Sequence, residues 1–160
     1  IATIEFGRHV LGLVGAHSTE FQRNTPHPVI DLQEDQRGVR LVGGTMRLGA
    51  QPCQLTMGTR TQRLYNAFVV HERHRHRYEF NNAYIEAYKK AGMVATGTNP
   101  QTKLVEIVEV KDHPWFVGVQ FHPEYRSTVM RPHPLFVHFV RAAMVQGGTP
   151  VQQAAEAQSA

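Results

Sequence analysis

Residues 115–121 read Trp-Phe-Val-Gly-Val-Gln-Phe and are followed without a break by His122-Pro123-Glu124. A short run that is nearly all apolar is typical of a strand covered on both faces, as in a layered α/β fold. In such folds, polar side chains at the carboxyl ends of strands carry the chemistry. We therefore expect His122 and Glu124 to emerge together at the end of a buried strand.

Outward from this segment, the hydrophobic pattern predicts an α/β sandwich of layers. Further strands are expected at 45–56, 67–79, 93–97 and 103–110, and helices at 1–11, 82–92 and 135–144. Residues 16–44 have the composition of a long loop, which in a compact domain is more often functional than idle. The Gln- and Ala-rich residues 149–160 are expected to be a disordered tail, which leaves 1–148 as the folded part.

Composition excludes several classes of protein. The chain has 160 residues, of which 41% are hydrophobic and 19% charged, as in a folded domain. It has no apolar run long enough for a transmembrane helix and no signal peptide at its start, so we expect no membrane partner and a cytoplasmic location. The single cysteine, Cys53, cannot form an internal disulfide, which fits a reducing compartment.

Positive charge gathers in one place, the run 71–77. Lys and Arg total 17 against 13 Asp and Glu, an excess that also occurs in proteins that bind nucleic acid. The run lacks the interleaved aromatic residues of a stacking surface. Strand alternation places Arg73, Arg75 and Arg77 on one face, opposite His74 and His76. An arginine that captures a carboxylate or phosphate fits this pattern best.

A metal site would use the three histidines of this run, His71, His74 and His76. Neighbouring guanidinium groups would repel a cation, and no Cys or Asp completes the ligand set. We therefore expect no metal in this chain. Cys53 is not expected to be a nucleophile. Its surroundings, Gln51-Pro52-Cys53-Gln54, lack the small flanking residues that a nucleophile elbow needs. A buried, inert thiol is the expected role.

Proton transfer is the chemistry expected of His122. An imidazole at a strand end can transfer protons, and a carboxylate two residues later can hold its other nitrogen. A solvated polar turn is the alternative for such a short motif.

Taken together, these segments resemble the glutamine amidotransferase domain of the CTP synthase family. The matching motifs are Ser18-Thr19-Glu20-Phe21, Gly43-Gly44-Thr45-Met46-Arg47-Leu48-Gly49, Glu72-Arg73-His74-Arg75-His76-Arg77-Tyr78-Glu79, and Phe121-His122-Pro123-Glu124 followed by His133-Pro134-Leu135-Phe136. The His-Pro-Glu motif alone would indicate only the wider class of triad-type (class I) amidotransferases. The resemblance implies their fold, with a central, mostly parallel sheet and helices on both faces.

The resemblance also implies roles for four residues. His122 would be the general acid and base, and Glu124 would orient it. Glu20 would bind the amino group of L-glutamine, and Arg77 would bind its α-carboxylate. The family's nucleophile lies in a G-x-C-x-G-x-Q elbow just before the helix that opens here at Ile1, so this chain as given is expected to hydrolyse no glutamine.

The remaining implications concern the parent protein. Ammonia would pass to a synthase domain in the same parent chain, where ATP with Mg²⁺ phosphorylates UTP and ammonia displaces the phosphate to give CTP. A homotetramer would form through that synthase domain. The loop Gln33 to Val42 occupies the place of a lid linked to activation by GTP, although no residue of it is assigned a GTP contact. No cofactor is expected in this chain.

Two other classes of function stay open at this point. An inactive amidotransferase-like binding or regulatory domain would keep the fold without the chemistry. A basic RNA-binding module is favoured only by the charge and by the run 71–77.

Overall fold

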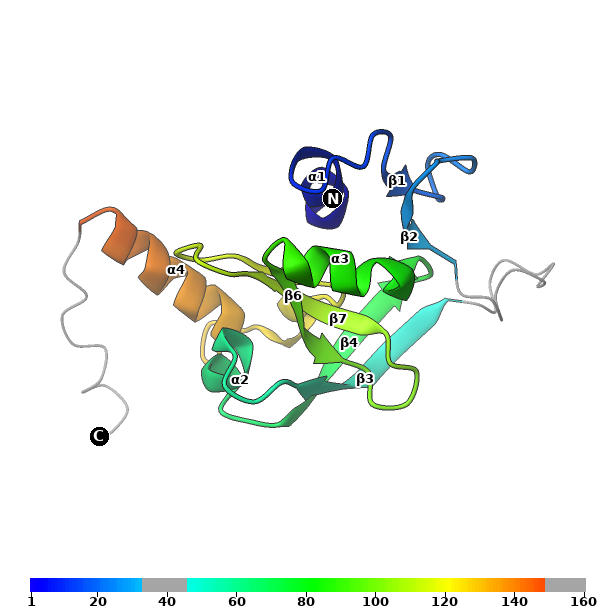
Figure 1. Ribbon diagram of the computed structural model, residues 1–160. Helices are drawn as coiled ribbons and strands as arrows, with labels where there is room; N and C mark the ends of the chain where they lie inside the picture. Colours follow the sequence, from blue (N-terminus) through cyan, green and yellow to red (C-terminus); the bar gives the residue numbers. More distant parts are fainter. Residues whose placement is uncertain (33–45, 149–160) are drawn as a thin grey trace.

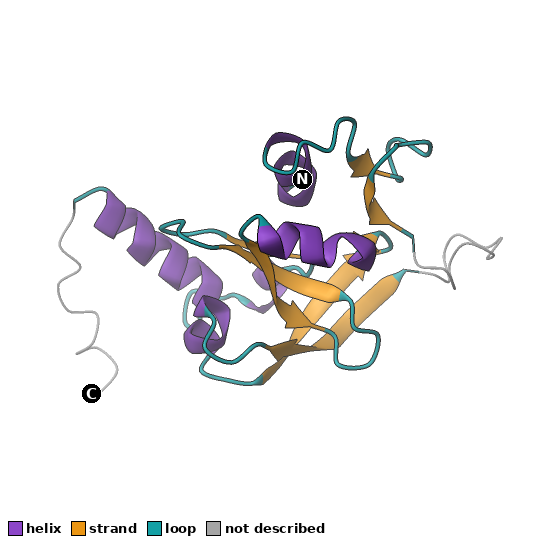
Figure 2. Cartoon of the chain, viewed as in Figure 1, coloured by secondary structure: helices purple, strands orange, loops and turns teal. Residues whose placement is uncertain are grey.

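The computed structural model describes residues 1–32 and 46–148 of the chain. Two sheets and the helices around them make up the fold (Figures 1 and 2). The helices are α1 (Ala2–His9), α2 (Arg60–Tyr65), α3 (Ile85–Lys90) and α4 (Pro134–Gln146), with short 3-10 helices η2 (Asn82–Tyr84) and η3 (Pro123–Arg126). The strands are β1 (His17–Ser18), β2 (Pro28–Asp31), β3 (Arg47–Leu55), β4 (Val69–His76), β5 (Glu79–Phe80), β6 (Met93–Thr98), β7 (Val105–Val110) and β8 (Val117–Val119).

The larger sheet has the strand order β4-β3-β6-β7-β8, and every neighbouring pair in it is antiparallel. The smaller sheet has the order β1-β2-β5, in which β1 and β2 are parallel. The α/β class is confirmed, but the expected parallel order is wrong for these strands. Short connections such as the one from β6 to β7 return the chain in the opposite direction, whereas a parallel pair needs a long crossover.

Two apolar clusters lie on opposite sides of the larger sheet. One joins Ile4 of α1 and Tyr88 of α3 to Val108 of β7. The other joins Ile107, the next residue of β7, to Leu135 of α4, with Leu64 of α2 packed against it. Figure 1 accordingly shows α1 and α3 on one side of the sheet and α2 and α4 on the other. Helices on both faces were expected, and the layers agree.

Local sequence explains several element boundaries. The Asn81 side chain accepts a hydrogen bond from the Ala83 backbone at the start of η2, and α3 ends with Lys89 and Lys90 in its last turn. Helix α2 was not expected, although Thr59 caps it by accepting from the Gln62 backbone. The Thr-x-x-Gln spacing from Thr59 to Gln62 is the sequence signal that could have revealed this helix.

Three expectations need correction. The segment 115–121 forms only the three-residue β8, which is half-buried and therefore not covered on both faces. Among the described strands, β8 pairs only with β7. The expected strand 67–79 is two strands, because β4 ends at His76 and β5 pairs with β2 in the other sheet. The loop expected at 16–44 contains β1 and β2.

Residues 33–45 and 149–160 lie outside the described part of the chain, and with them the predicted lid loop and tail. Among the described residues, none of the helices combines the length and the apolar character that a membrane crossing requires.

Candidate functional site

His122 and Glu124 form a hydrogen-bonded pair in the segment that follows β8, which ends at Val119. Nδ1 of His122 lies 2.7 Å from Oε1 of Glu124, and the two side chains are 37% and 54% exposed. The hydrogen bond from His122 lowers the pKa of Glu124, so its carboxylate is ionised at neutral pH. A carboxylate can only accept, so Nδ1 of His122 carries the proton and Nε2 of the neutral ring is the basic nitrogen. The pair therefore has the arrangement of a general base with its orienting group.

The backbone around His122 is held by neighbouring segments. Its backbone N–H donates to the carbonyl of Arg73 in β4 at 2.9 Å, and its ring stacks on Tyr125 with centroids 5.1 Å apart. Two residues earlier, the Gln120 side chain donates to the carbonyl of Tyr78 at 2.9 Å. The segment 120–122 thus runs beside β4 and the turn that contains Arg77.

Glu20 and Arg77 both lie in connections next to strands of the smaller sheet. Glu20 follows β1, and Arg77 precedes β5. Glu20 is exposed in the turn after β1, where its backbone N–H donates to Oγ of Ser18. Arg77 is half-buried between β4 and β5. Their neighbours Thr19 and Tyr78 line one open hollow of about 420 Å³, together with Asp31 of β2. The segments that carry the two residues therefore meet at one hollow, but Glu20 and Arg77 are not themselves among the residues that line it.

The predicted alternation along β4 is present. Arg73 and Arg75 are exposed, whereas Glu72 and His74 are buried on the inward face. Cys53 is 0% exposed, and burial, reinforced by the charges of Glu106 and Glu72, raises the pKa of its thiol to about 12. The thiol is buried and protonated, as expected of an inert cysteine.

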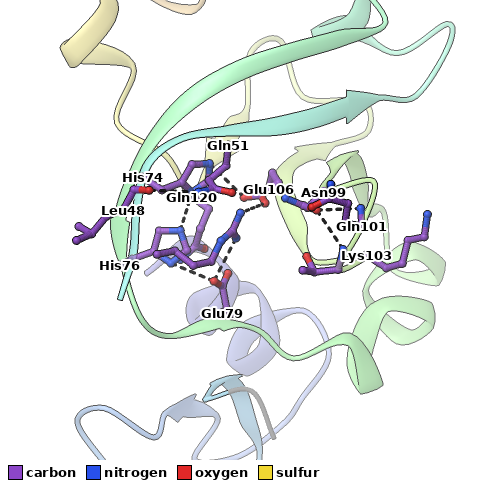
Figure 3. A network of polar contacts seen from close by, with 12 residues as sticks. Leu48, Gln51, His74, His76, Glu79, Asn99, Gln101, Lys103, Glu106 and Gln120 are labelled. Atoms are coloured by element: carbon purple, nitrogen blue, oxygen red, sulfur yellow. Dashed lines mark hydrogen bonds and ion pairs between the residues drawn. The ribbon is translucent and has the colours of Figure 1, made fainter. Parts of the chain in front are cut away.

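The inward histidines belong to a buried polar network that the sequence did not predict (Figure 3). Nδ1 of His74 lies 2.7 Å from Nε2 of His76, and Arg47 contacts both Glu106, at 2.7 Å, and Glu79, at 3.2 Å. His71, the third histidine of the metal hypothesis, is exposed. Its place is taken by Glu106, whose carboxylate and the rings of His74 and His76 offer ligand atoms within 4.8 Å of one another. The guanidinium of Arg47 already supplies a positive charge to this carboxylate.

A second pair of the same residue types lies in the interior. Nε2 of His133 contacts Oε1 of Glu72 at 2.9 Å, and the Tyr65 hydroxyl donates to the same oxygen at 2.9 Å. Nδ1 of His133 accepts from the backbone N–H of Leu135, which caps α4. Both side chains are 3% exposed. This network forms part of the floor of an open cavity of about 780 Å³ rimmed by Arg73 and Arg131.

Comparison with known proteins shows the family to which the chain belongs. Residues 1–142 match the family described as "Glutamine amidotransferase class-I". The CTP synthase of Cytophaga hutchinsonii is 60% identical over 142 residues, and that of Thermomicrobium roseum is 61% identical over 143 residues. Each match covers 89% of this chain and 26% of the relative, so the chain spans about a quarter of the length of these relatives.

A solved structure is also similar. It is described as "Trypanosoma brucei CTPS - glutaminase domain with bound acivicin", with 37% sequence identity and a TM-score of 0.83. The match covers 90% of this chain and 56% of that chain.

Proposed function

Since the chain belongs to the class-I glutamine amidotransferase family and matches the glutaminase portion of CTP synthases, we propose that it is part of the glutaminase domain of a longer protein, in which this domain releases ammonia from L-glutamine for the amination of UTP to CTP. The observation that carries the proposal is the His122–Glu124 pair, which has a basic Nε2 and is open to solvent. The high identity to CTP synthases along nearly the whole chain favours this activity over a non-catalytic binding or regulatory domain.

His122 transfers protons in the proposed reaction. A cysteine thiolate attacks the side-chain amide carbon of glutamine, and the imidazolium of His122 gives a proton to the departing ammonia. The neutral ring then takes a proton from water as the water attacks the thioester, which releases glutamate and restores the thiolate. Glu124 keeps Nδ1 protonated and stabilises the charged ring between the two steps.

Glu20 and Arg77 recognise the two charged ends of glutamine. The carboxylate of Glu20 pairs with the α-ammonium group, and the guanidinium of Arg77 forms two parallel hydrogen bonds with the α-carboxylate. This assignment is supported by the shared hollow that the neighbours of both residues line. It also agrees with the position of Arg77 beside the segment that holds His122.

The nucleophile is not Cys53, which is buried and protonated. The nucleophilic cysteine belongs to an elbow encoded upstream of Ile1, so residues 1–160 alone hydrolyse no glutamine. The parent protein also carries the synthase domain, which uses UTP, ATP and Mg²⁺, forms the tetramer and works in the cytoplasm, with GTP as an effector.

Two measurements test the proposal. The coding sequence upstream of Ile1 is determined, and the full-length protein that it encodes is assayed for glutamate release from glutamine. We expect a Gly-x-Cys-x-Gly stretch there, and glutamate release that stops in His122→Ala. Arg77→Ala is expected to raise the KM for glutamine more than it lowers kcat, because the α-carboxylate is bound in both the ground state and the transition state. Turnover by residues 1–160 that depends on Cys53, or an upstream sequence without a cysteine elbow, would contradict the proposal.

A further inference from the structure

The side chain of Tyr125 lies against the ring of His122, and the short helix that joins them accounts for this contact. Helix η3 (Pro123–Arg126) is a 3-10 helix that begins directly after His122, and the Tyr125 backbone N–H donates to the His122 carbonyl at 3.2 Å. A 3-10 helix has three residues per turn, so side chains three positions apart lie above one another. The two rings accordingly stack, with their centroids 5.1 Å apart and their planes 26° from parallel.

Helix η3 is attached to β4 at both of its ends. Before the helix, the backbone N–H of His122 donates to the carbonyl of Arg73 at 2.9 Å. At the last residue of the helix, Nη1 of Arg126 donates to the carbonyl of His71. The two acceptors lie two residues apart on β4, which is the outermost of the described strands at this side of the larger sheet. The stacked rings are therefore carried by a turn whose position relative to the sheet is fixed.

The hydrogen bond between His122 and Glu124 is by itself a weak restraint on the imidazole. The two side chains are 37% and 54% exposed, and water competes for a hydrogen bond at such a position. A single bond at Nδ1 also leaves the ring free to tilt about that bond. The Tyr125 ring covers one face of the imidazole and limits this tilt. Neither contact occupies Nε2, the nitrogen that exchanges protons in the proposed reaction.

The stack also favours the charged form of His122, which the proposed reaction uses when ammonia departs. A cation over the face of an aromatic ring is attracted by the negative charge of the π-electrons. Tyr125 therefore stabilises the imidazolium from its face, whereas Glu124 stabilises it in the plane of the ring through Nδ1. Both effects of Tyr125 depend on its aromatic face and not on its hydroxyl group.

We propose that Tyr125 is a positioning residue for proton transfer by His122, and that it acts through the face of its ring. The functional unit then extends one residue beyond the His-Pro-Glu motif and includes the turn that the motif begins. This inference rests on the proposed function for its effect on catalysis, but the stack itself is testable without any activity.

The first experiment observes the ring protons of His122 by NMR in the 160-residue chain at a single pH. Nuclear Overhauser effects between the His122 and Tyr125 rings are expected, and their absence would overturn the inference without any variant. Protons over an aromatic face resonate upfield, so Tyr125→Leu should move the His122 ring signals downfield. Tyr125 is 51% exposed, so this variant is expected to fold. Signals that stay in place in Tyr125→Leu would overturn the stack.

Two further variants separate the ring face from other effects. Tyr125→Phe keeps the aromatic face and should leave the His122 signals in place. Phe68→Leu is the control, because Phe68 is 63% exposed and makes no ring contact with the described aromatic and histidine side chains. It should also leave the His122 signals in place. A downfield change in Tyr125→Phe or in Phe68→Leu that equals the change in Tyr125→Leu would overturn the role of the ring face.

The second experiment measures glutamine hydrolysis by the full-length protein. We expect Tyr125→Leu to lower kcat by roughly three- to tenfold, the fold-change to which the energy of an exposed aromatic pair corresponds. The KM for glutamine should change by less than about twofold, because the stack acts on proton transfer and not on binding. Tyr125→Phe should restore kcat, and Phe68→Leu should not change it. An unchanged kcat in Tyr125→Leu, or a rise in KM alone, would overturn the positioning role.

The two experiments distinguish failure of this inference from failure of the proposed function. A full-length protein without glutaminase turnover would overturn the proposed function and, with it, the role of Tyr125 in catalysis. The NMR result would still decide whether the stack exists. A stack that is present by NMR in a protein whose turnover does not depend on Tyr125 would overturn this inference alone.

Discussion

Two His–Glu pairs in this molecule have nearly the same geometry and opposite surroundings. His122 and Glu124 are separated by 2.7 Å at the surface, and His133 and Glu72 by 2.9 Å in the interior. In the interior pair both ring nitrogens are used, one by Glu72 and one by the Leu135 backbone. In the surface pair Glu124 holds only Nδ1, which leaves Nε2 for exchange with a substrate.

The difference shows that the residue pair alone does not define a catalytic site. The interior pair anchors the start of α4 to β4, and both nitrogens of its ring are already bonded within the protein. The surface pair contributes little to stability, because water competes for an exposed hydrogen bond. We therefore expect loss of the surface pair to affect catalysis and loss of the interior pair to affect folding.

The largest expected effect is on turnover. His122→Ala in the full-length protein should lower kcat for glutamine hydrolysis by about 10²–10⁴-fold, the usual contribution of a general acid or base. Its thermal unfolding midpoint should stay close to that of the unmodified protein, because the side chain is exposed. Calorimetry and a glutamate assay on the same preparation measure both quantities. A His122→Ala protein that is unfolded would remove the distinction between the two pairs.

The next largest effect is on stability. Glu72→Ala removes the partner of two buried groups, His133 and Tyr65, and breaking a buried pair costs about 3–5 kcal/mol. Urea unfolding of the chain should show this loss as a lower midpoint. Glu124→Ala is the matched control at the surface and should leave the midpoint nearly unchanged. Equal midpoints for the two variants would show that the interior pair is no more structural than the surface pair.

The buried network of Arg47, His74, His76, Glu79 and Glu106 should give stability an unusual dependence on pH. His74 and His76 have lowered pKa values in the folded state, so the unfolded chain binds more protons below about pH 6.5 and stability falls as pH decreases. Glu79 has a raised pKa of about 8, so the folded state binds more protons between about pH 4.5 and 8 and loses stability as pH rises through that range. Between about pH 4.5 and 6.5 both effects act, and the two histidines change the stability more than the single carboxyl does, so stability still falls as pH decreases.

These groups together predict a stability maximum near pH 6.5, which unfolding midpoints across pH 5–9 would measure. Glu79→Gln should remove the decline between pH 6.5 and 8 and keep the decline on the acid side. A variant whose alkaline decline matches the unmodified chain would contradict the role of Glu79.

The smallest expected effect concerns a support of the interior pair. Oγ of Ser127 accepts a hydrogen bond from the His133 backbone at 3.0 Å, so Ser127→Ala should lower the free energy of unfolding by about 1 kcal/mol. Thr128→Ala, which removes an exposed hydrogen bond to the Arg131 backbone, is the control and should cost less. The same denaturation assay resolves both, and a larger cost for Thr128→Ala would show that the support lies elsewhere.

The sequence predicted those features that depend on neighbours along the chain. The alternation of Arg73 and His74 on β4, the extent of β7 and the position of α4 follow from local apolar patterns, and the His122–Glu124 contact follows from a spacing of two residues. Membership of the family followed from motifs and was confirmed by the comparisons.

The sequence did not predict features that depend on distant strands. The buried network requires Arg47, Glu79 and Glu106, which come together only when three strands from two sheets are placed. Burial of residues 115–121 also depends on what lies beside them, and here β8 has a described strand on one side only. Apolar composition alone cannot report the number of neighbours.

The position of β8 has a consequence for handling the isolated chain. Its sequence, Val117-Gly118-Val119, has neither a charged residue nor a proline to discourage an incoming strand. Its other edge has no partner among the described strands, and such an edge is a template on which a second polypeptide can extend the sheet. Concentrated solutions of residues 1–160 should accordingly show self-association that grows with concentration, and a charged substitution at Val117 or Val119 should suppress it.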